Sequence, residues 1–139
     1  MPWTEPIIDR TFADVINGTS KGYINASDLN RIEGNCEYLA DKLTEYGYRI
    51  SISTKTDWTM QDFPYRSEID RIRDNVNALI NAYYKMQGSP DIRYWGSLDW
   101  RDANSLEQNI KNIDILLQRM IAGFKRCGTF RSGQEVVLP

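Results

Sequence analysis

The chain has 139 residues, with 17 basic side chains, 19 acidic side chains and no histidine. This length fits one domain with a single core, and 41% hydrophobic with 26% charged residues is a globular composition. The net charge of -2 gives no electrostatic reason to expect binding to nucleic acid or to an anionic membrane. Without histidine the chain cannot form Ser-His or Cys-His nucleophile pairs, or histidine metal sites. We therefore expect no cofactor and no metal.

The N-terminal residues do not have the pattern of a secretion signal. They contain no basic segment followed by an apolar one, and nowhere does the chain approach the ~18 consecutive apolar residues that span a bilayer. We expect one domain over residues 1–139, made in a cytoplasm, with no signal peptide and no membrane insertion. Cys36 and Cys127 lie far apart, and Cys36 falls among apolar positions, which favours a reduced, buried thiol.

Residues 27–46 form the first expected helix. Asn25 and Asp28 have the spacing of a capping pair at its start. The apolar residues alternate in steps of three and four, as in helices that pack at shallow angles. They are Leu29, Ile32, Cys36, Leu39, Leu43 and Tyr46.

The segment that follows has a different period. Residues 48–54 alternate between Tyr, Ile or Thr and polar residues, and this period of two predicts a short, half-buried strand. Residues 92–95 show the same pattern in miniature. A Thr-x-x-Asp turn stands at residues 11–14 and again at residues 59–62. We expect the linkers to be short strands or hairpins.

Two more helices are expected at residues 67–86 and 100–125, capped by Ser67 with Asp70 and by Asp99 with Asp102. Both keep the same alternation of threes and fours, so three apolar faces can meet in one core. The sequence therefore predicts a mainly α fold, a three-helix bundle with short strand or hairpin linkers. The two series are Ile69, Ile72, Val76, Leu79, Tyr83 and Met86, and then Ala103, Leu106, Ile110, Ile113, Leu117, Met120 and Phe124.

An internal repeat connects the three helices. Residues 29–35, 69–75 and 103–109 are alike at offsets of 40 and 34, with a short polar residue second and Asn seventh. Asn is unfavourable inside a helix because its side chain competes for backbone hydrogen bonds. We interpret the three residues as bonding across helices or to the incoming linker, which would fix the register. The alternative is a solvated flank position. The residues are Asn35, Asn75 and Asn109.

Paired carboxylates are the only enzymatic chemistry that the composition leaves open, because glycoside hydrolysis needs two acids and no histidine. Four acids recur at every fourth residue of the first helix, a spacing typical of a solvated face. We interpret Arg31, Arg71 and Tyr38 as solvated or as snorkelling, with the polar end of the side chain in solvent. No cleft that would raise one carboxyl pKa can be inferred from this pattern. The four acids are Glu33, Glu37, Asp41 and Glu45.

The tryptophans lie in linkers or helix starts, outside the apolar series. They could form a platform for a sugar or a protein, since aromatic faces supply area and stacking. They could instead cover the ends of a small bundle, which we favour because so small a core needs covering. The residues are Trp3, Trp58, Trp95 and Trp100.

The C-terminal tail, residues 128–139, places Val136, Val137 and Leu138 together near the end of the chain. Such an apolar run needs a surface to cover it. It could pair with residues 48–54 of its own chain, or add to an edge of a neighbouring subunit. We favour the intermolecular role because the helices already have one another as partners.

One stretch also resembles a known family. Residues 28–39 read Asp-x-Asn-Arg-Ile-Glu-x-Asn-x-x-Tyr-Leu, residues 56–59 read Thr-Asp-Trp-Thr, and residues 124–130 end in Cys-Gly-Thr-Phe. This combination resembles a repeat in tail-associated structural proteins of phages and prophages of Gram-positive bacteria. The third repeat departs from it, with Ala103 and Ser105 where the first has Leu29 and Arg31.

The resemblance implies a non-enzymatic structural and interaction module of a virion, associated with the tail or tail fibre. Its partners would be other virion proteins or further copies of itself. One alternative is a carbohydrate-binding adaptor that uses the linker tryptophans on a cell-surface glycan. A less favoured alternative is a cell-wall hydrolase built on the helix carboxylates.

Overall fold

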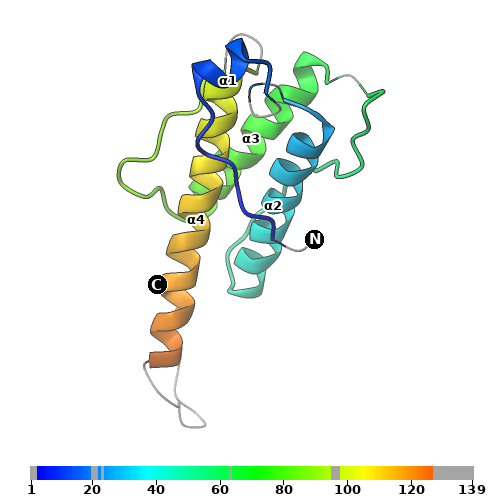
Figure 1. The fold of residues 1–139 in the computed structure, drawn as a ribbon. Helices are drawn as coiled ribbons and strands as arrows, with labels where there is room; N and C mark the ends of the chain where they lie inside the picture. Colours follow the sequence, from blue (N-terminus) through cyan, green and yellow to red (C-terminus); the bar gives the residue numbers. More distant parts are fainter. Residues whose placement is uncertain (1–2, 20–21, 23, 63, 95–97, 127–139) are drawn as a thin grey trace.

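The computed structural model describes residues 3–19, 22, 24–62, 64–94 and 98–126. Its elements in chain order are a short helix α1 (Phe12–Ile16) and three long helices, α2 (Ala26–Glu45), α3 (Arg66–Ala82) and α4 (Trp100–Arg126). The mainly α bundle expected from the sequence is confirmed (Figure 1). None of the helices in the described part of the chain is long and apolar enough to cross a membrane.

The three long helices run in the same direction. All three begin at the end of the bundle where α1 lies (Figure 1). Contacts between helices agree with this arrangement, because Arg31 of α2 reaches Glu107 of α4 and Arg71 of α3 reaches Glu33 of α2. A 20-residue helix is about 30 Å long, so each linker must travel that distance back before the next helix begins.

Capping acids set the helix starts at equivalent positions of the repeat. The Asp28 carboxylate accepts from the Asn25 N–H, and the Glu68 carboxylate accepts from the Tyr65 N–H at 3.4 Å. Asp102 does the same for the Asp99 N–H at the start of α4. The caps expected at Asn25 and Asp99 are therefore confirmed. The cap expected at Ser67 is wrong, because α3 begins earlier, at Arg66.

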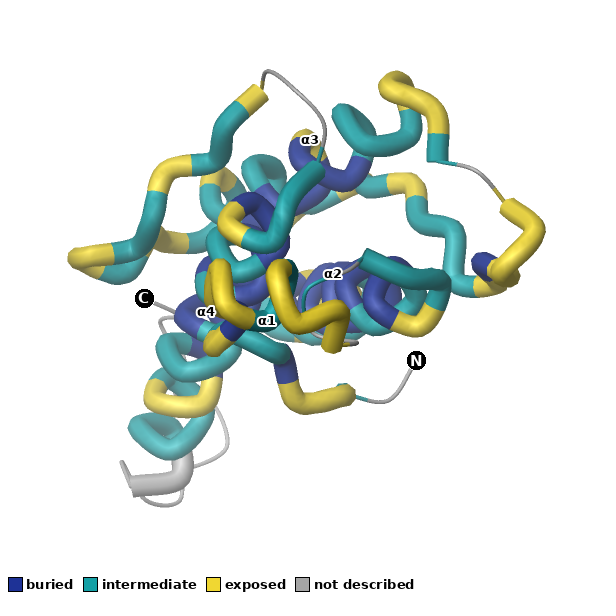
Figure 2. Tube along the Cα trace, turned by 45° about the horizontal axis from the view of Figure 1, so that its top comes forward, coloured by how far each residue is buried: buried dark blue, intermediate teal, exposed yellow. Residues whose placement is uncertain are grey.

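The core consists of layers in which each helix contributes one residue of the repeat. The central layer is Leu39, Leu79 and Ile113, each no more than 1% exposed. Figure 2 shows the buried residues on the facing sides of α2, α3 and α4. The apolar series read from the sequence supplies this core, apart from Ile69 and the residues at the far ends, which are half-buried. Trp58 joins it from the linker after α2.

The linkers are extended but are not strands. No strand is assigned at residues 48–54 or at residues 92–94, and residue 95 lies outside the described residues. The expected alternation of burial is present, since Ile50 and Ile52 are half-buried while Ser51 and Ser53 are exposed. A burial pattern with a period of two indicates an extended chain with one covered side, but a β-strand also needs a second strand to pair with. Here helices occupy both sides of each linker.

The helix ends depart from the repeat. Helix α3 stops at Ala82, four residues before the expected end, because Tyr83 leaves the helical region and the chain turns back at Gly88 with φ of 85°. Helix α4 continues to Arg126 and projects beyond the other two (Figure 1). Phe124 on this projection stacks on Tyr46, with ring centroids 6.3 Å apart.

We predict that Leu39→Ala, Leu79→Ala and Ile113→Ala each lower the free energy of unfolding by ~2–4 kcal/mol, because each leaves a cavity in the same closed layer. Tyr84→Ala is the matched control, since Tyr84 is 53% exposed. Chemical denaturation measures the changes. Losses under ~0.5 kcal/mol for all three core variants would contradict the layered bundle.

Candidate functional site

The three repeated asparagines hold the linkers that precede their helices. We call residues 3–10 linker 1, residues 48–58 linker 2 and residues 89–94 linker 3. Asn35 exchanges two hydrogen bonds with the backbone of Thr4, at 2.9 and 2.7 Å. Asn75 donates to the Ser53 carbonyl at 2.6 Å, and Asn109 donates to the Pro90 carbonyl at 2.9 Å. All three Asn side chains therefore bond to the incoming linker, as interpreted from the sequence.

The second position of the repeat holds linkers 1 and 2 further along. Asn104 of α4 accepts from the Arg10 N–H at 3.2 Å and donates to its carbonyl at 2.9 Å. Asn30 of α2 makes the same pair of bonds to the backbone of Trp58, at 2.8 and 3.0 Å. The amide side chain thus makes the hydrogen bonds to the linker backbone that a neighbouring strand would make in a sheet.

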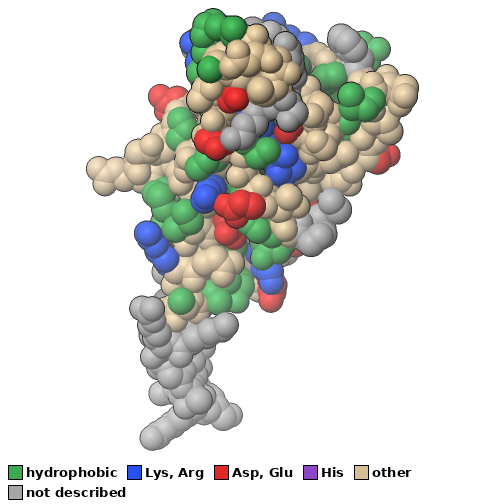
Figure 3. All heavy atoms as spheres, viewed as in Figure 1, with side chains coloured by type: hydrophobic (Ala, Val, Ile, Leu, Met, Phe, Trp, Pro, Cys, Tyr) green, Lys and Arg blue, Asp and Glu red, His purple; other side chains and the backbone are tan. Residues whose placement is uncertain are grey.

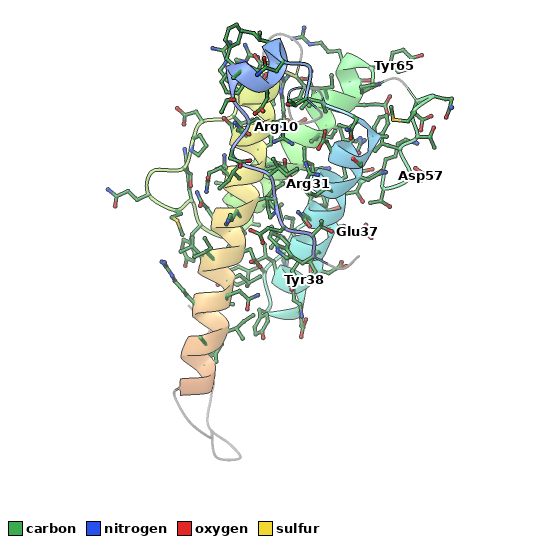
Figure 4. All side chains as sticks on the ribbon, in the orientation of Figure 1. Arg10, Arg31, Glu37, Tyr38, Asp57 and Tyr65 are labelled. Atoms are coloured by element: carbon green, nitrogen blue, oxygen red, sulfur yellow. The ribbon has the colours of Figure 1, made fainter. Side chains whose placement is uncertain are left out.

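The fifth position carries a buried charge in every repeat. Glu107 is fully buried and accepts from the Ile7 N–H at 3.2 Å. Arg10 of linker 1 meets it at 2.7 Å and Arg31 of α2 at 2.6 Å, so two cations flank one carboxylate. Asp28 balances the second cation at 2.7 Å from Arg31. The group joins linker 1, α2 and α4, and Figure 4 labels its two cations, Arg10 and Arg31. Arg10, Asp28 and Glu107 are buried, and Arg31 is half-buried.

Glu33 binds linker 2 in the groove between α2 and α3, as Glu107 binds linker 1 in the groove between α2 and α4. It is fully buried and accepts from the Lys55 N–H at 3.0 Å. The Trp58 indole N–H and the Arg71 guanidinium also donate to it. Trp58 therefore occupies the position that Arg10 has in the groove between α2 and α4, and Arg71 occupies the position that Arg31 has there. Removing one partner of such a group costs several kcal/mol, because a charge stays buried without its partner.

The third groove, between α3 and α4, has a buried cation in place of the buried glutamate. Arg73 stands where the other repeats have Glu, and it is 1% exposed. Ser105 stands where the others have Arg. Arg73 bonds to Asp70 at 3.2 Å and lies 3.9 Å from Asp102, which in turn binds Arg93 of linker 3. The change from acid to base thus comes from Arg73 of the second repeat, while the departure of the third repeat, Ser105, removes the charge that Arg31 and Arg71 carry at the same position.

These contacts correct three expectations. Arg31 and Arg71 are not solvated, because each binds a buried glutamate. Glu33 does not belong to a solvated face with Glu37, since it is fully buried while Glu37 is half-buried. One sequence signal indicated this burial and was missed. The fifth position of the repeat is Glu, Arg and Glu in the three helices, and this position faces the linkers.

The thiol of Cys36 lies in the core, as expected. Burial raises its pKa above the ordinary value, and the nearby Glu33 carboxylate adds to the effect. A thiol held in its neutral form is a poor nucleophile, so Cys36 packs as a small apolar residue. Cys127 lies outside the described residues.

The three described tryptophans do not form one exposed surface. Trp58 is 5% exposed with Lys55 over its ring, so it is a core residue and not part of an exposed platform. Trp3 is half-buried against Tyr38, and Trp100 is half-buried beside Arg101. Trp95 and the tail residues Val136, Val137 and Leu138 lie outside the described residues.

Four of the six large hydrophobic side chains that are exposed among the described residues belong to segments at the end where the long helices begin. We call this surface, Phe12, Ile16, Met60 and Tyr65, the apolar end; its residues are 62% to 77% exposed. Figure 3 shows hydrophobic side chains over α1 at the top of the view. A hollow of about 530 Å³ lies beside Met60, with mostly apolar walls. Its other lining residues include Ile24, Ala26, Leu29, Pro64, Ile69 and Leu98.

No group of three or more His, Cys, Asp or Glu side chains that could hold a metal is found among the described residues. No protein-family model matches the chain, and the searches of curated proteins and of solved structures gave no match. The geometry of the linkers and of the apolar end therefore carries the functional argument.

We predict that Asn35→Ala, Asn75→Ala and Asn109→Ala lower the free energy of unfolding unequally. Asn35→Ala should cost most, ~2 kcal/mol, because it removes both bonds to Thr4, and the other two ~1 kcal/mol each. The control is Asn81→Ala on the exposed side of α3, which should be neutral or stabilising by helix propensity. Urea denaturation decides, and a gain in stability for all three repeat variants would refute the role of these bonds.

Proposed function

We propose that this chain is a non-enzymatic structural and interaction module of a phage or prophage virion, associated with the tail or tail fibre. The observation that carries the proposal is the apolar end, where four large hydrophobic side chains of the described residues are 62% to 77% exposed. Clustered exposed apolar residues mark protein interaction surfaces more often than solvated faces.

The use of the polar residues supports the same proposal. Glu33 and Glu107 receive hydrogen bonds from the chain's own backbone and side chains, so they serve to hold linkers. A catalytic acid needs a cleft in which substrate can reach its carboxyl group. The burial of Trp58 likewise removes one of the side chains on which the carbohydrate-binding alternative rested.

We predict that the chain is found in purified virions of the phage or prophage that encodes it, at a constant ratio to the other tail proteins. Quantitative mass spectrometry of gradient-purified particles measures this ratio. Absence from particles, with abundant protein in the producing cells, would refute the proposal.

The variant Phe12→Ser/Ile16→Ser tests the apolar end. It should keep the thermal midpoint of the wild type, because both side chains are exposed, and should reduce incorporation into particles. Tyr84→Ser, away from this end and 53% exposed, is the control and should incorporate normally. Normal incorporation of both variants would exclude the apolar end as the contact surface.

A further inference from the structure

Two turns at the apolar end repeat each other in sequence. Residues 9–14, which we call turn 1, read Asp-Arg-Thr-Phe-Ala-Asp, and residues 57–62, which we call turn 2, read Asp-Trp-Thr-Met-Gln-Asp. Each turn continues a linker whose backbone is held by an asparagine at the second position of the repeat, Asn104 or Asn30. Each turn therefore has an aspartate at both ends and one large apolar residue between them, Phe12 or Met60.

The two turns also share their local structure. The Asp14 carboxylate accepts from the Thr11 N–H at 2.9 Å, and the Asp62 carboxylate accepts from the Thr59 N–H at 2.9 Å. In the opposite direction, the Asp14 N–H donates to the Thr11 carbonyl at 3.1 Å and the Asp62 N–H to the Thr59 carbonyl at 3.0 Å. The apolar residue after the threonine is 62% exposed in turn 1 and 77% exposed in turn 2. The chain thus presents an exposed apolar side chain twice, from the same turn geometry.

The bundle relates the two turns by a rotation about its long axis. Three parallel helices carry one repeat each, and the linkers fill the three grooves in turn: linker 1 between α4 and α2, linker 2 between α2 and α3, and linker 3 between α3 and α4. A rotation of about one third of a turn therefore carries turn 1 onto turn 2. The matching residues 96–99 read Gly-Ser-Leu-Asp, with Ser97 in the position of Phe12, so the apolar residue occurs in two of the three positions.

Both turns surround their apolar residue with acidic groups. Asp9 of turn 1 is exposed, and the side chain of Asp57 of turn 2 is 85% exposed. Arg10 adds no charge to this surface, because it is buried against Glu107. Lys55 lies 3.0 Å from Asp57, and with Asp62 it leaves turn 2 with more negative than positive charge. A surface complementary to either turn therefore has an apolar pocket with basic side chains at its rim.

We propose that turns 1 and 2 bind equivalent sites on two subunits of one partner, a cyclic homotrimer whose three-fold axis continues the axis of the bundle. Each site is an apolar pocket with a basic rim, and it takes up Phe12 on one subunit and Met60 on the next. Identical pockets on identical subunits can hold both turns only if the rotation between the subunits is the rotation between the turns. This inference rests on the proposed role of the apolar end as a contact surface, and it adds the symmetry and the chemistry of the partner.

Photo-crosslinking from the two equivalent positions tests the symmetry. The variants Phe12→p-benzoylphenylalanine and Met60→p-benzoylphenylalanine of the full chain are irradiated in the producing cells, and the adducts are identified by peptide mass spectrometry. We predict that both positions crosslink to the same segment of one partner protein, because both turns occupy the same kind of pocket. Tyr84→p-benzoylphenylalanine, 53% exposed and away from this end, is the control and should not reach that segment. Adducts of positions 12 and 60 on different proteins or on separate segments, or no adduct from either position, overturn the proposal.

Charge reversal tests the basic rim. Asp9→Lys should lower the yield of the adduct from position 12, and Asp57→Lys the yield from position 60, each about tenfold, because a lysine would then face basic side chains. The matched control is Asp91→Lys in linker 3, where the side chain is 97% exposed and lies outside both turns. Its yields should equal those of the wild type. Unchanged yields in both turn variants, or an equal loss in the control, would contradict a basic rim.

The mass of the intact complex tests the number of partner subunits. Native mass spectrometry of the complex purified with the wild-type chain should give one copy of this chain with three copies of the partner. A complex with a single partner subunit would overturn the three-fold arrangement, since the two turns would then contact different parts of one subunit.

Failure of this inference can be told apart from failure of the virion role. If purified particles contain the chain at a constant ratio but positions 12 and 60 crosslink to separate segments, the symmetric partner is refuted and the virion role stands. If the chain is absent from particles but both positions crosslink to one segment of a homotrimer in the producing cells, the virion role is refuted and the symmetric partner stands.

Discussion

The structure depends on one constraint: three helices that point the same way need linkers as long as the helices themselves. Each linker crosses the surface of the bundle as an extended chain, with backbone N–H and carbonyl groups on both sides. Unpaired backbone groups are costly when they are covered by side chains, and no second strand is there to take them. The helices supply the partners, from side chains at the second, fifth and seventh positions of their repeat.

Buried charge follows from the same constraint. A carboxylate can accept several hydrogen bonds at once, so Glu107 bonds a linker N–H and two guanidinium groups together. Such groups rarely add much net stability over apolar packing, but they penalise any arrangement that leaves one member alone. The third groove penalises a wrong linker in this way, because its buried charge is a cation and not a carboxylate. A linker that carries a donor opposite Glu33 would face a cation at Arg73, so each linker is matched to its own groove.

The sequence allowed the helices, the caps of α2 and α4 and the buried faces to be predicted, because these follow from local spacing. The repeat even located Asn35, Asn75 and Asn109 and their bonds to the linkers. The direction of the helices could not be predicted, since a bundle with alternating directions would show the same apolar series. The linkers were assigned as strands because the period of two is the same for any extended chain with one covered side.

The charged residues were misjudged for a related reason. Arg31 and Glu33 look like surface residues when one helix is considered alone, and their burial depends on a linker far away in sequence. Glu107 lies 97 residues from Arg10. Only the recurrence of Glu, Arg and Glu at one repeat position pointed to a shared role, and that signal needs the three helices to be compared in register.

Amide hydrogen exchange tests most directly the claim that helix side chains hold the linker backbones. The amides of Ile7, Arg10, Lys55 and Trp58 should exchange as slowly as those of the helix core, although they belong to no strand. In Glu107→Gln, the amides of Ile7 and Arg10 should exchange faster while those of Lys55 and Trp58 stay protected. Exchange of all four amides at the rate of an unstructured chain in the wild type would contradict the account.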